Sequence, residues 1–257
     1  TVALRAQAFT AGGRKLTRLV AGVSQDAADA TWRGSVDADQ LGGYVEYRAP
    51  SGPANPGRVH ARLARLALPP ADAESVEDLL VKAPASVPAL DIVIDDFELR
   101  GKKFGRVEVA AVNRAVEGAG REWHMSRLAV SNPDAQLTGT GQWQPGAGAG
   151  RRRMVMDFKL ELSDSGAALE RLGFGGTLRG GKGHMSGQLS WAGSPLSLDV
   201  PSLDGRINLA LDAGQFLKAG PGGARLLSVL NLQALPRRLL LDFRDVFQEG
   251  FAFDSVT

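Results

Sequence analysis

Met154-Val-Met-Asp-Phe-Lys-Leu-Glu-Leu162 is the stretch of sequence that decides the fold. Every second residue in it, from Met154 to Leu162, is apolar, while Asp157, Lys159 and Glu161 stand between them. Successive side chains of a β-strand point to opposite faces of a sheet. The stretch therefore predicts a strand with one apolar face and one face in water.

The same alternation recurs along the chain, with turn residues about every ten positions. We expect further strands at residues 91–95, 106–110, 126–130, 184–191, 195–200, 206–211 and 239–243. Helices are expected at residues 72–81, at 164–172 with a stop at Gly173, and near 222–235 before Pro236. The 32 glycines fit a chain with many turns. This pattern predicts a mainly β fold with an antiparallel meander and two or three short helices.

The chain also repeats itself loosely about every ninety residues. Residues 9–19 find an echo in 97–107, and Trp32 is echoed by Trp123. The first two expected helices follow corresponding strands of this repeat. Repeated units that cover their neighbours predict an elongated, stacked sheet. We expect modules at residues 1–90, 91–175 and 176–257, the last with the helix near 222–235.

Composition excludes several classes of protein and of site. The chain of 257 residues has no cysteine, so disulfides and cysteine-based metal or redox sites are excluded. Its formal charge of +2 is too small to indicate a nucleic-acid binder. No apolar run of about 18 residues is present, so no spanning helix is expected. Both ends read as interrupted strands, and we expect a fragment of a longer protein.

Residue types that often serve in catalysis or in metal and phosphate binding do not occur here in the patterns that such sites require. His60, His124 and His184 lie far apart, without the convergent spacing of a zinc site. The glycine-rich residues 173–183 lack the Gly-Lys-Ser/Thr and the helix of a phosphate loop, so a turn is favoured. No Gly-x-Ser-x-Gly motif occurs. Acidic pairs (Asp95/Asp96, Asp37/Asp39, Asp242/Asp245) and the basic residues 151–153 are read as solvated strand ends. We expect no enzyme, metal or cofactor.

The long apolar face remains, and it has two interpretations. One is the interior of an ordinary β-sandwich. The other is an open, curved sheet whose concave face stays available to lipid chains. The residues that would line such a groove are Ile92, Ile94, Val107, Val109, Met154, Met156, Phe158, Leu160, Leu162, Leu209 and Leu211.

Four blocks of sequence carry a family resemblance. They are residues 180–195, 203–209, 221–239 and 242–254, with the short block 213–216 after the second, and they occur in this order. The succession resembles the C-terminal part of the AsmA-like family, to which TamB also belongs. The match is dense from about Trp123 onward and rests on the repeat pattern before that.

The resemblance implies a fold and a function. Proteins of this family are anchored in the inner membrane of Gram-negative bacteria and extend through the periplasm as a groove-like "β-taco". They are implicated in moving phospholipid toward the outer membrane, and they offer no catalytic residues to transfer. The implied partners are phospholipid acyl chains and other envelope proteins, with membrane contact through segments outside this chain. Two alternatives stay open: an envelope scaffold or chaperone-like module that acts by strand addition, and a hydrolase with an unrecognised site.

Overall fold

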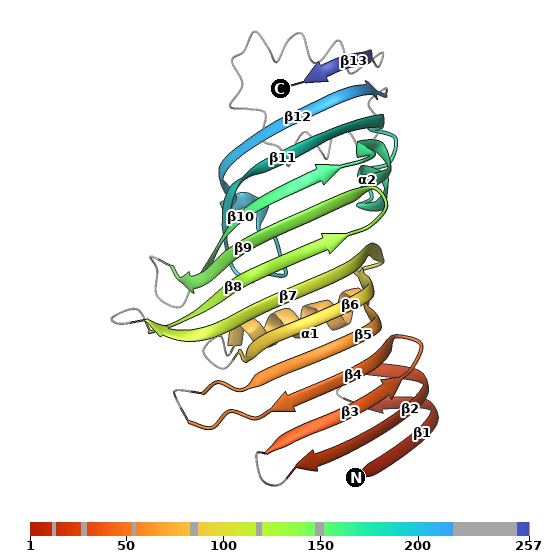
Figure 1. The fold of residues 1–257 in the computed structure, drawn as a ribbon, viewed down its shortest axis with the longest axis vertical. Helices are drawn as coiled ribbons and strands as arrows, with labels where there is room; N and C mark the ends of the chain where they lie inside the picture. Colours follow the sequence, from red (N-terminus) through yellow and green to blue (C-terminus); the bar gives the residue numbers. More distant parts are fainter. Residues whose placement is uncertain are drawn as a thin grey trace. The chain divides into compact units, whose positions relative to one another are not determined.

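The computed structural model describes residues 1–11, 14–26, 30–52, 55–82, 87–116, 120–146, 152–217 and 251–256. Thirteen strands are hydrogen-bonded side by side in the order of the sequence (Figure 1). The strands β1 to β13 span, in this order, Val2–Ala11, Arg14–Asp26, Thr31–Asp37, Leu41–Arg48, Arg58–Leu68, Ala89–Leu99, Lys102–Val116, Gly120–Ser131, Ala135–Pro145, Arg152–Leu162, Leu178–Ala192, Asp204–Phe216 and Phe251–Val256. The helices are α1 (Pro70–Lys82) and α2 (Ser165–Arg171), with a short 3-10 turn, η2, at Val200–Ser202. The predicted mainly β fold is confirmed.

The chain divides into two compact units. The first consists of Thr1–Ser131, Thr138–Asp157 and Leu189–Asp204. The second consists of Asn132–Leu137, Phe158–Gln188 and Gly205–Thr257. The division into three repeat modules stays a prediction.

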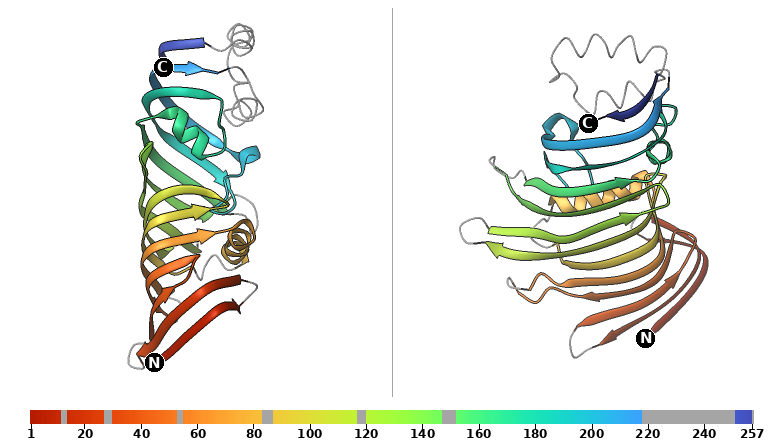
Figure 2. Two further views of the ribbon diagram at one scale, coloured as in Figure 1. Left: turned by 90° about the vertical axis from the view of Figure 1, so that its right-hand side faces the viewer. Right: turned by 45° about the horizontal axis from the view of Figure 1, so that its top comes forward.

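Helix α1 explains the one departure from the antiparallel pattern among the paired strands β1 to β8. Strands β5 and β6 are parallel, with Ala61 opposite Ile92, whereas their neighbours pair antiparallel. Parallel neighbours need a crossover of a dozen or more residues, because the chain must return to its starting edge. The segment that contains α1 provides this crossover, and it places the helix on one face of the sheet. In the first unit the strands bend around the side on which α1 lies (Figure 2).

Both helices within the described residues were expected, but their settings differ. At α2 the Asp164 side chain caps the helix by accepting a hydrogen bond from the Ala167 N–H at 3.0 Å. The strands that flank α2 are not parallel. The Gly193 N–H donates to the Arg152 carbonyl at 2.9 Å, so the end of β11 lies beside the start of β10. The two helices at corresponding positions of the sequence repeat therefore lie in different connections. Helix α1 connects two parallel strands, whereas α2 connects two antiparallel strands.

The prediction of a strand at residues 195–200 is wrong. Leu196, Leu198 and Val200 alternate as a strand would, but this segment forms turns that lead into η2. The Leu196 N–H donates to Ser194 Oγ at 3.1 Å, and the Ser197 N–H to the Ser194 carbonyl at 3.3 Å. These local hydrogen bonds compete with strand pairing. The expected helix near 222–235 and the strand at 239–243 lie outside the described residues.

Candidate functional site

One face of the sheet in the first unit is lined by apolar side chains, and we call it the apolar face. Its central row follows directly from the strand registers and crosses all eight strands from β1 to β8. The row consists of Val2, Val23, Gly34, Val45, Ala61, Ile92, Val109 and Leu128. Its side chains lie on the same face because each residue is the direct cross-strand partner of the next.

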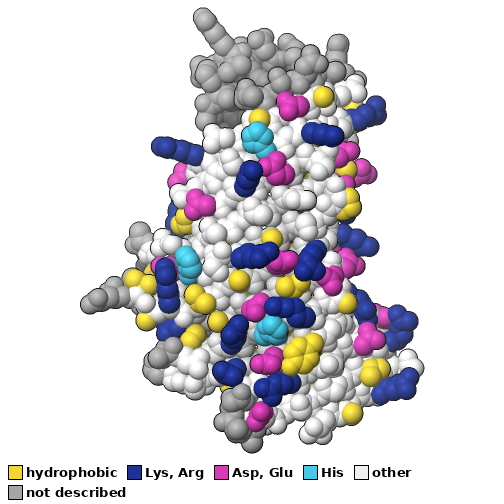
Figure 3. Space-filling model, in the orientation of Figure 1, with side chains coloured by type: hydrophobic (Ala, Val, Ile, Leu, Met, Phe, Trp, Pro, Cys, Tyr) yellow, Lys and Arg dark blue, Asp and Glu magenta, His cyan; other side chains and the backbone are white. Residues whose placement is uncertain are grey.

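The opposite face, which we call the polar face, is held by ion pairs between neighbouring strands. The Asp91 carboxylate accepts from Arg62 at 2.9 Å and lies 3.1 Å from His60 Nδ1. Arg127 pairs with Glu108 at 2.7 Å. Charged side chains are spread over this face in the space-filling view, where the sheet is seen from the side away from α1 (Figure 3). The two faces of the sheet therefore differ sharply in polarity.

The apolar face is open to solvent over β1 to β4. Trp32 is 44% exposed and its cross-strand partner Tyr47 is 38% exposed. Val2, Leu4 and Val23 on the same face are also exposed. Large apolar side chains that are exposed together on one face make this part of the sheet a candidate interaction surface.

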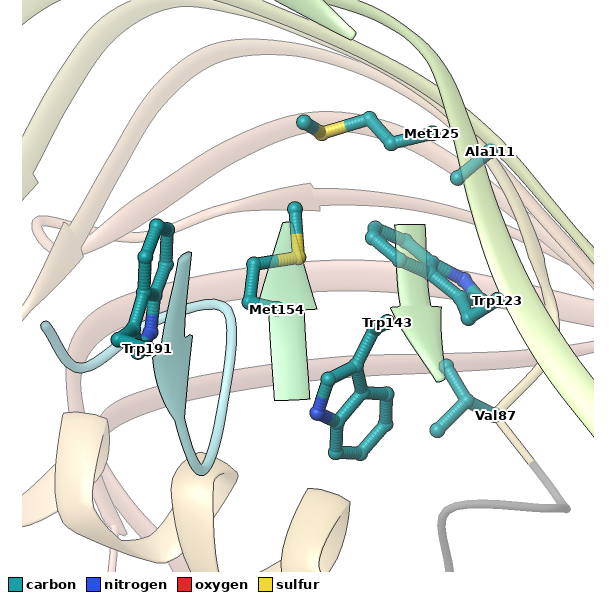
Figure 4. Packing of buried hydrophobic residues seen from close by; sticks show 7 residues of the cluster. All are labelled: Val87, Ala111, Trp123, Met125, Trp143, Met154 and Trp191. Atoms are coloured by element: carbon teal, nitrogen blue, oxygen red, sulfur yellow. The ribbon is translucent and has the colours of Figure 1, made fainter. Parts of the chain in front are cut away.

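Further along, the apolar face is covered. A cluster of buried side chains lies over β7 to β11 (Figure 4). Leu80 of α1 and Leu203 before β12 pack against it. Its buried members are Val87, Ala111, Trp123, Met125, Trp143, Met154 and Trp191. We call it the tryptophan–methionine cluster. Trp143 and Met154 are each only 1% exposed, so this part is a packed interior.

Two indoles fasten the covering segment 193–203 to the cluster. Trp143 Nε1 donates to the Gly193 carbonyl at 2.6 Å, and Trp191 Nε1 donates to the Ser194 carbonyl at 2.9 Å. The Ala192 N–H donates to Ser202 Oγ at 2.8 Å at the other end of the segment. Buried tryptophans need such acceptors for their N–H groups, so these contacts select one position for the segment.

Polar groups close the edge of the cluster at the ends of the strands. Asn113 Nδ2 donates to the Val87 carbonyl at 2.8 Å, and Arg121 Nε donates to Asn113 Oδ1 at 2.9 Å. Arg152 Nη2 donates to the carbonyls of Arg121 and Trp143 at 2.8 and 2.6 Å. Burial lowers the pKa of Arg152, and the charge of Glu122 acts in the opposite direction. The guanidinium thus sits in a partly dehydrated position.

The predicted groove residues of the first unit share the apolar face but differ in exposure. Ile92 pairs with Val109, and Ile94 with Val107, as two adjacent cross-strand pairs. Ile92 and Val109 are half-buried, whereas Ile94 and Val107 are buried. Met156 is half-buried and packs against the tryptophan–methionine cluster, in which Met154 is fully enclosed.

The remaining predicted groove residues belong to the second unit. Phe158 and Leu211 are 8% exposed, and Leu160, Leu162 and Leu209 are half-buried. Met154 to Leu162 form one strand, β10, as expected, so their alternate side chains share a face. The role of all eleven residues as a lipid-contacting set stays a prediction.

The histidines and the acidic pairs within the described residues take structural positions, whereas Asp242 and Asp245 lie outside the described residues. His60 contacts Asp91, His184 is exposed, and His124 Nδ1 is buried without a hydrogen-bond partner. The pair Asp95/Asp96 lies at a β-bulge within β6, not at its end. Among the described residues, no group of three or more histidines and acids could hold a metal ion. Within the same residues, no helix has the length and apolar character needed to cross a bilayer.

Sequence reasoning missed the most exposed part of the apolar face. In the sequence, Trp32 stands out only as the echo of Trp123, and no pattern marks Tyr47. The alternation in Trp32-Arg-Gly-Ser-Val36 and Tyr44-Val-Glu-Tyr47 is short and interrupted by glycine, which weakened the signal. Both residues become recognisable once the registers place them beside each other on the apolar face.

Comparison with known proteins gives a relative and a family. The chain is 31% identical over 157 residues to the intermembrane phospholipid transporter YhdP of Escherichia coli (strain K12). This match covers 61% of the chain and 12% of the relative, so the chain corresponds to a small part of that protein. No solved structure matches the chain. A family model described as YhdP protein matches residues 1–257, and the chain therefore belongs to the YhdP family.

Proposed function

We propose that this chain is a section of a phospholipid conduit in the envelope of a Gram-negative bacterium. In this proposal acyl chains move along the apolar face while the polar face meets the water of the periplasm, and an anchor in the inner membrane lies outside the chain. The observation that carries the proposal is the apolar row across β1 to β8, opposite a face of ion pairs. The similarity to a phospholipid transporter supports it.

The physical reason lies in the hydration of acyl chains. A phospholipid with two chains exposes roughly thirty methylene groups to water, and at about 0.8 kcal/mol each this costs on the order of 20 kcal/mol. A continuous apolar face offsets much of this cost at every step. It needs no specific polar contact and no catalytic group.

The open and covered parts of the apolar face have different roles in this proposal. Trp32, Tyr47 and Val23 are accessible, so they form the part on which acyl chains first lie. Ile92 and Val109 continue the face. Met154 is enclosed, so a chain could reach it only if α1 or the segment 193–203 moved.

A pair of photo-crosslinking variants tests the proposal. A benzophenone amino acid replaces Trp32 on the apolar face or, as the matched control, Val112 on the polar face, which is 49% exposed. Val112 lies on the polar face because its neighbours Ala111 and Asn113 pair with Met125 and Trp123 of the cluster. After incubation with vesicles of phosphatidylethanolamine and phosphatidylglycerol, mass spectrometry counts the lipid adducts.

We expect several-fold more lipid adduct at position 32 than at position 112. Equal yields at both positions would refute binding to the apolar face. If the same crosslinking in isolated bacterial envelopes gave protein adducts at position 32 without lipid adducts, this result would favour the scaffold that binds other envelope proteins.

A further inference from the structure

Arg152 occupies an unusual place for a charged residue. It precedes Met154 by two positions on β10, so by strand alternation its side chain shares the face of the tryptophan–methionine cluster. Arg121 stands in the same relation to Trp123 on β8. Both arginines lie at the start of their strands. Cationic side chains therefore mark this edge of the apolar face.

The guanidinium of Arg152 is held in a defined orientation. Its central carbon lies 4.7 Å from the centroid of the Trp143 ring, a cation–π contact. Nη2 is fixed by the carbonyls of Arg121 and Trp143. Nε, in contrast, is buried and has no hydrogen-bond acceptor. A buried donor without an acceptor is costly, so this position is a candidate for binding a group that accepts hydrogen bonds.

The charge of Arg152 also lacks a direct counter-ion. Among the ion pairs of the described residues, none includes Arg152. The acid that influences it, Glu122, is bonded to Arg114 at 3.3 Å on the polar face. A partly dehydrated cation without a bonded anion is costly, and an anionic ligand would remove this cost.

A second group in the cluster has the same requirement. Trp123 Nε1 is buried and has no acceptor. An arginine side chain can only donate hydrogen bonds and carries a positive charge, so the ligand that complements Arg152 is a negative group with several acceptor oxygens. A phosphate group has this chemistry.

We propose that Arg152 is the centre of a phosphate-binding site at the edge of the apolar face. For a phospholipid, the headgroup phosphate would pair with Arg152 while the acyl chains lie along the neighbouring part of the apolar face, which they reach when α1 or the segment 193–203 moves. This source of the phosphate rests on the proposed function above; free phosphate is the other source. Arg152 would thereby distinguish phospholipids from lipids that lack phosphate.

The test compares two lipids with identical acyl chains. Dioleoyl phosphatidylglycerol and dioleoylglycerol are offered in the same detergent micelle, and binding is measured by native mass spectrometry. We expect Arg152→Gln to weaken binding of the phospholipid by about tenfold to a hundredfold, because a charge-assisted hydrogen bond is lost. Binding of dioleoylglycerol should not change. Arg152→Lys, which keeps the charge without the planar donors, should lie between.

Arg153→Gln is the matched control. Arg153 is the next residue, faces the other side of β10 and is already bonded to Ser190, with Asp204 at 3.6 Å. The Arg153→Gln substitution should change the binding of neither lipid. Equal loss of both lipids in Arg152→Gln would overturn the proposal, because the residue would then only organise the cluster. Unchanged binding of both lipids in Arg152→Gln would also overturn the proposal.

Two further measurements separate the possible failures. If Arg152→Gln does not fold, as judged by circular dichroism, the wild-type chain decides: equal affinity for both lipids overturns the proposal. If the wild-type chain binds neither lipid, the proposed function fails, and calorimetry with inorganic phosphate tests the site alone. Phosphate binding that weakens in Arg152→Lys and disappears in Arg152→Gln then supports a site for free phosphate, and absence of binding to the wild-type chain overturns it.

Discussion

Replacement of Met154 by alanine tests whether the tryptophan–methionine cluster is a packed interior. Met154 is 1% exposed and lies in one cluster with Trp143 and Trp191. Its terminal methyl fills the space over Gly141: a Cβ placed on Gly141 would lie 2.6 Å from Met154 Cε. Truncation therefore leaves a cavity that its closely packed surroundings cannot easily fill.

The magnitude follows from this burial. Met→Ala substitutions in packed cores lower the free energy of unfolding by about 2–5 kcal/mol, and we expect about 3 kcal/mol here. For a domain of roughly 150–250 residues this lowers the melting temperature by roughly 6–12 °C. Three of the four tryptophans, Trp123, Trp143 and Trp191, belong to the cluster. Urea denaturation followed by intrinsic fluorescence therefore reports directly on it.

Met156→Ala is the matched control. Met156 is half-buried on the same face of the same strand, so its truncation should lower the free energy of unfolding by less than half as much. If Met154→Ala is as stable as the wild-type chain to within about 0.5 kcal/mol, the burial argument is refuted. Such a result, together with loss of lipid capture, would mean that Met154 is exposed to lipid.

Two more predictions concern the sheet that carries the apolar face. Gly43 has a φ of +138°, and a Cβ there would lie 2.3 Å from the Arg62 carbonyl oxygen, so Gly43→Ala should lower the melting temperature. Gly22→Ala, whose Cβ meets nothing within 4 Å, should not; equal melting of the two variants would contradict this. Burial raises the pKa of Asp91, but hydrogen bonds from Arg62 and His60 lower it by more, so the net pKa lies below its usual value. Its stabilising contribution is therefore present above the unfolded pKa of about 3.9 and is lost as the pH falls through the folded pKa. Urea midpoints at about pH 6 and about pH 3 should differ less in Asp91→Asn than in the wild-type chain, and an unchanged difference would rule this out.

The local sequence was a good guide to strands and caps. The alternation in β10 and the cap at Asp164 depend on side chains within a few residues, so they could be predicted without the fold. The same local signal failed at residues 195–200. There, hydrogen bonds to Ser194 favour turns over strand pairing.

The sequence by itself determined which side chains of each strand share a face, because alternation is a property of the extended backbone. It also determined that one of these faces is apolar. Only the tertiary structure decided which part of that face is accessible. The crossover through α1 and the segment 193–203 bring distant residues over Met154 and Trp143, while Trp32 and Tyr47 stay exposed. Burial depends on what packs against a side chain, and those contacts come from residues far away in the sequence.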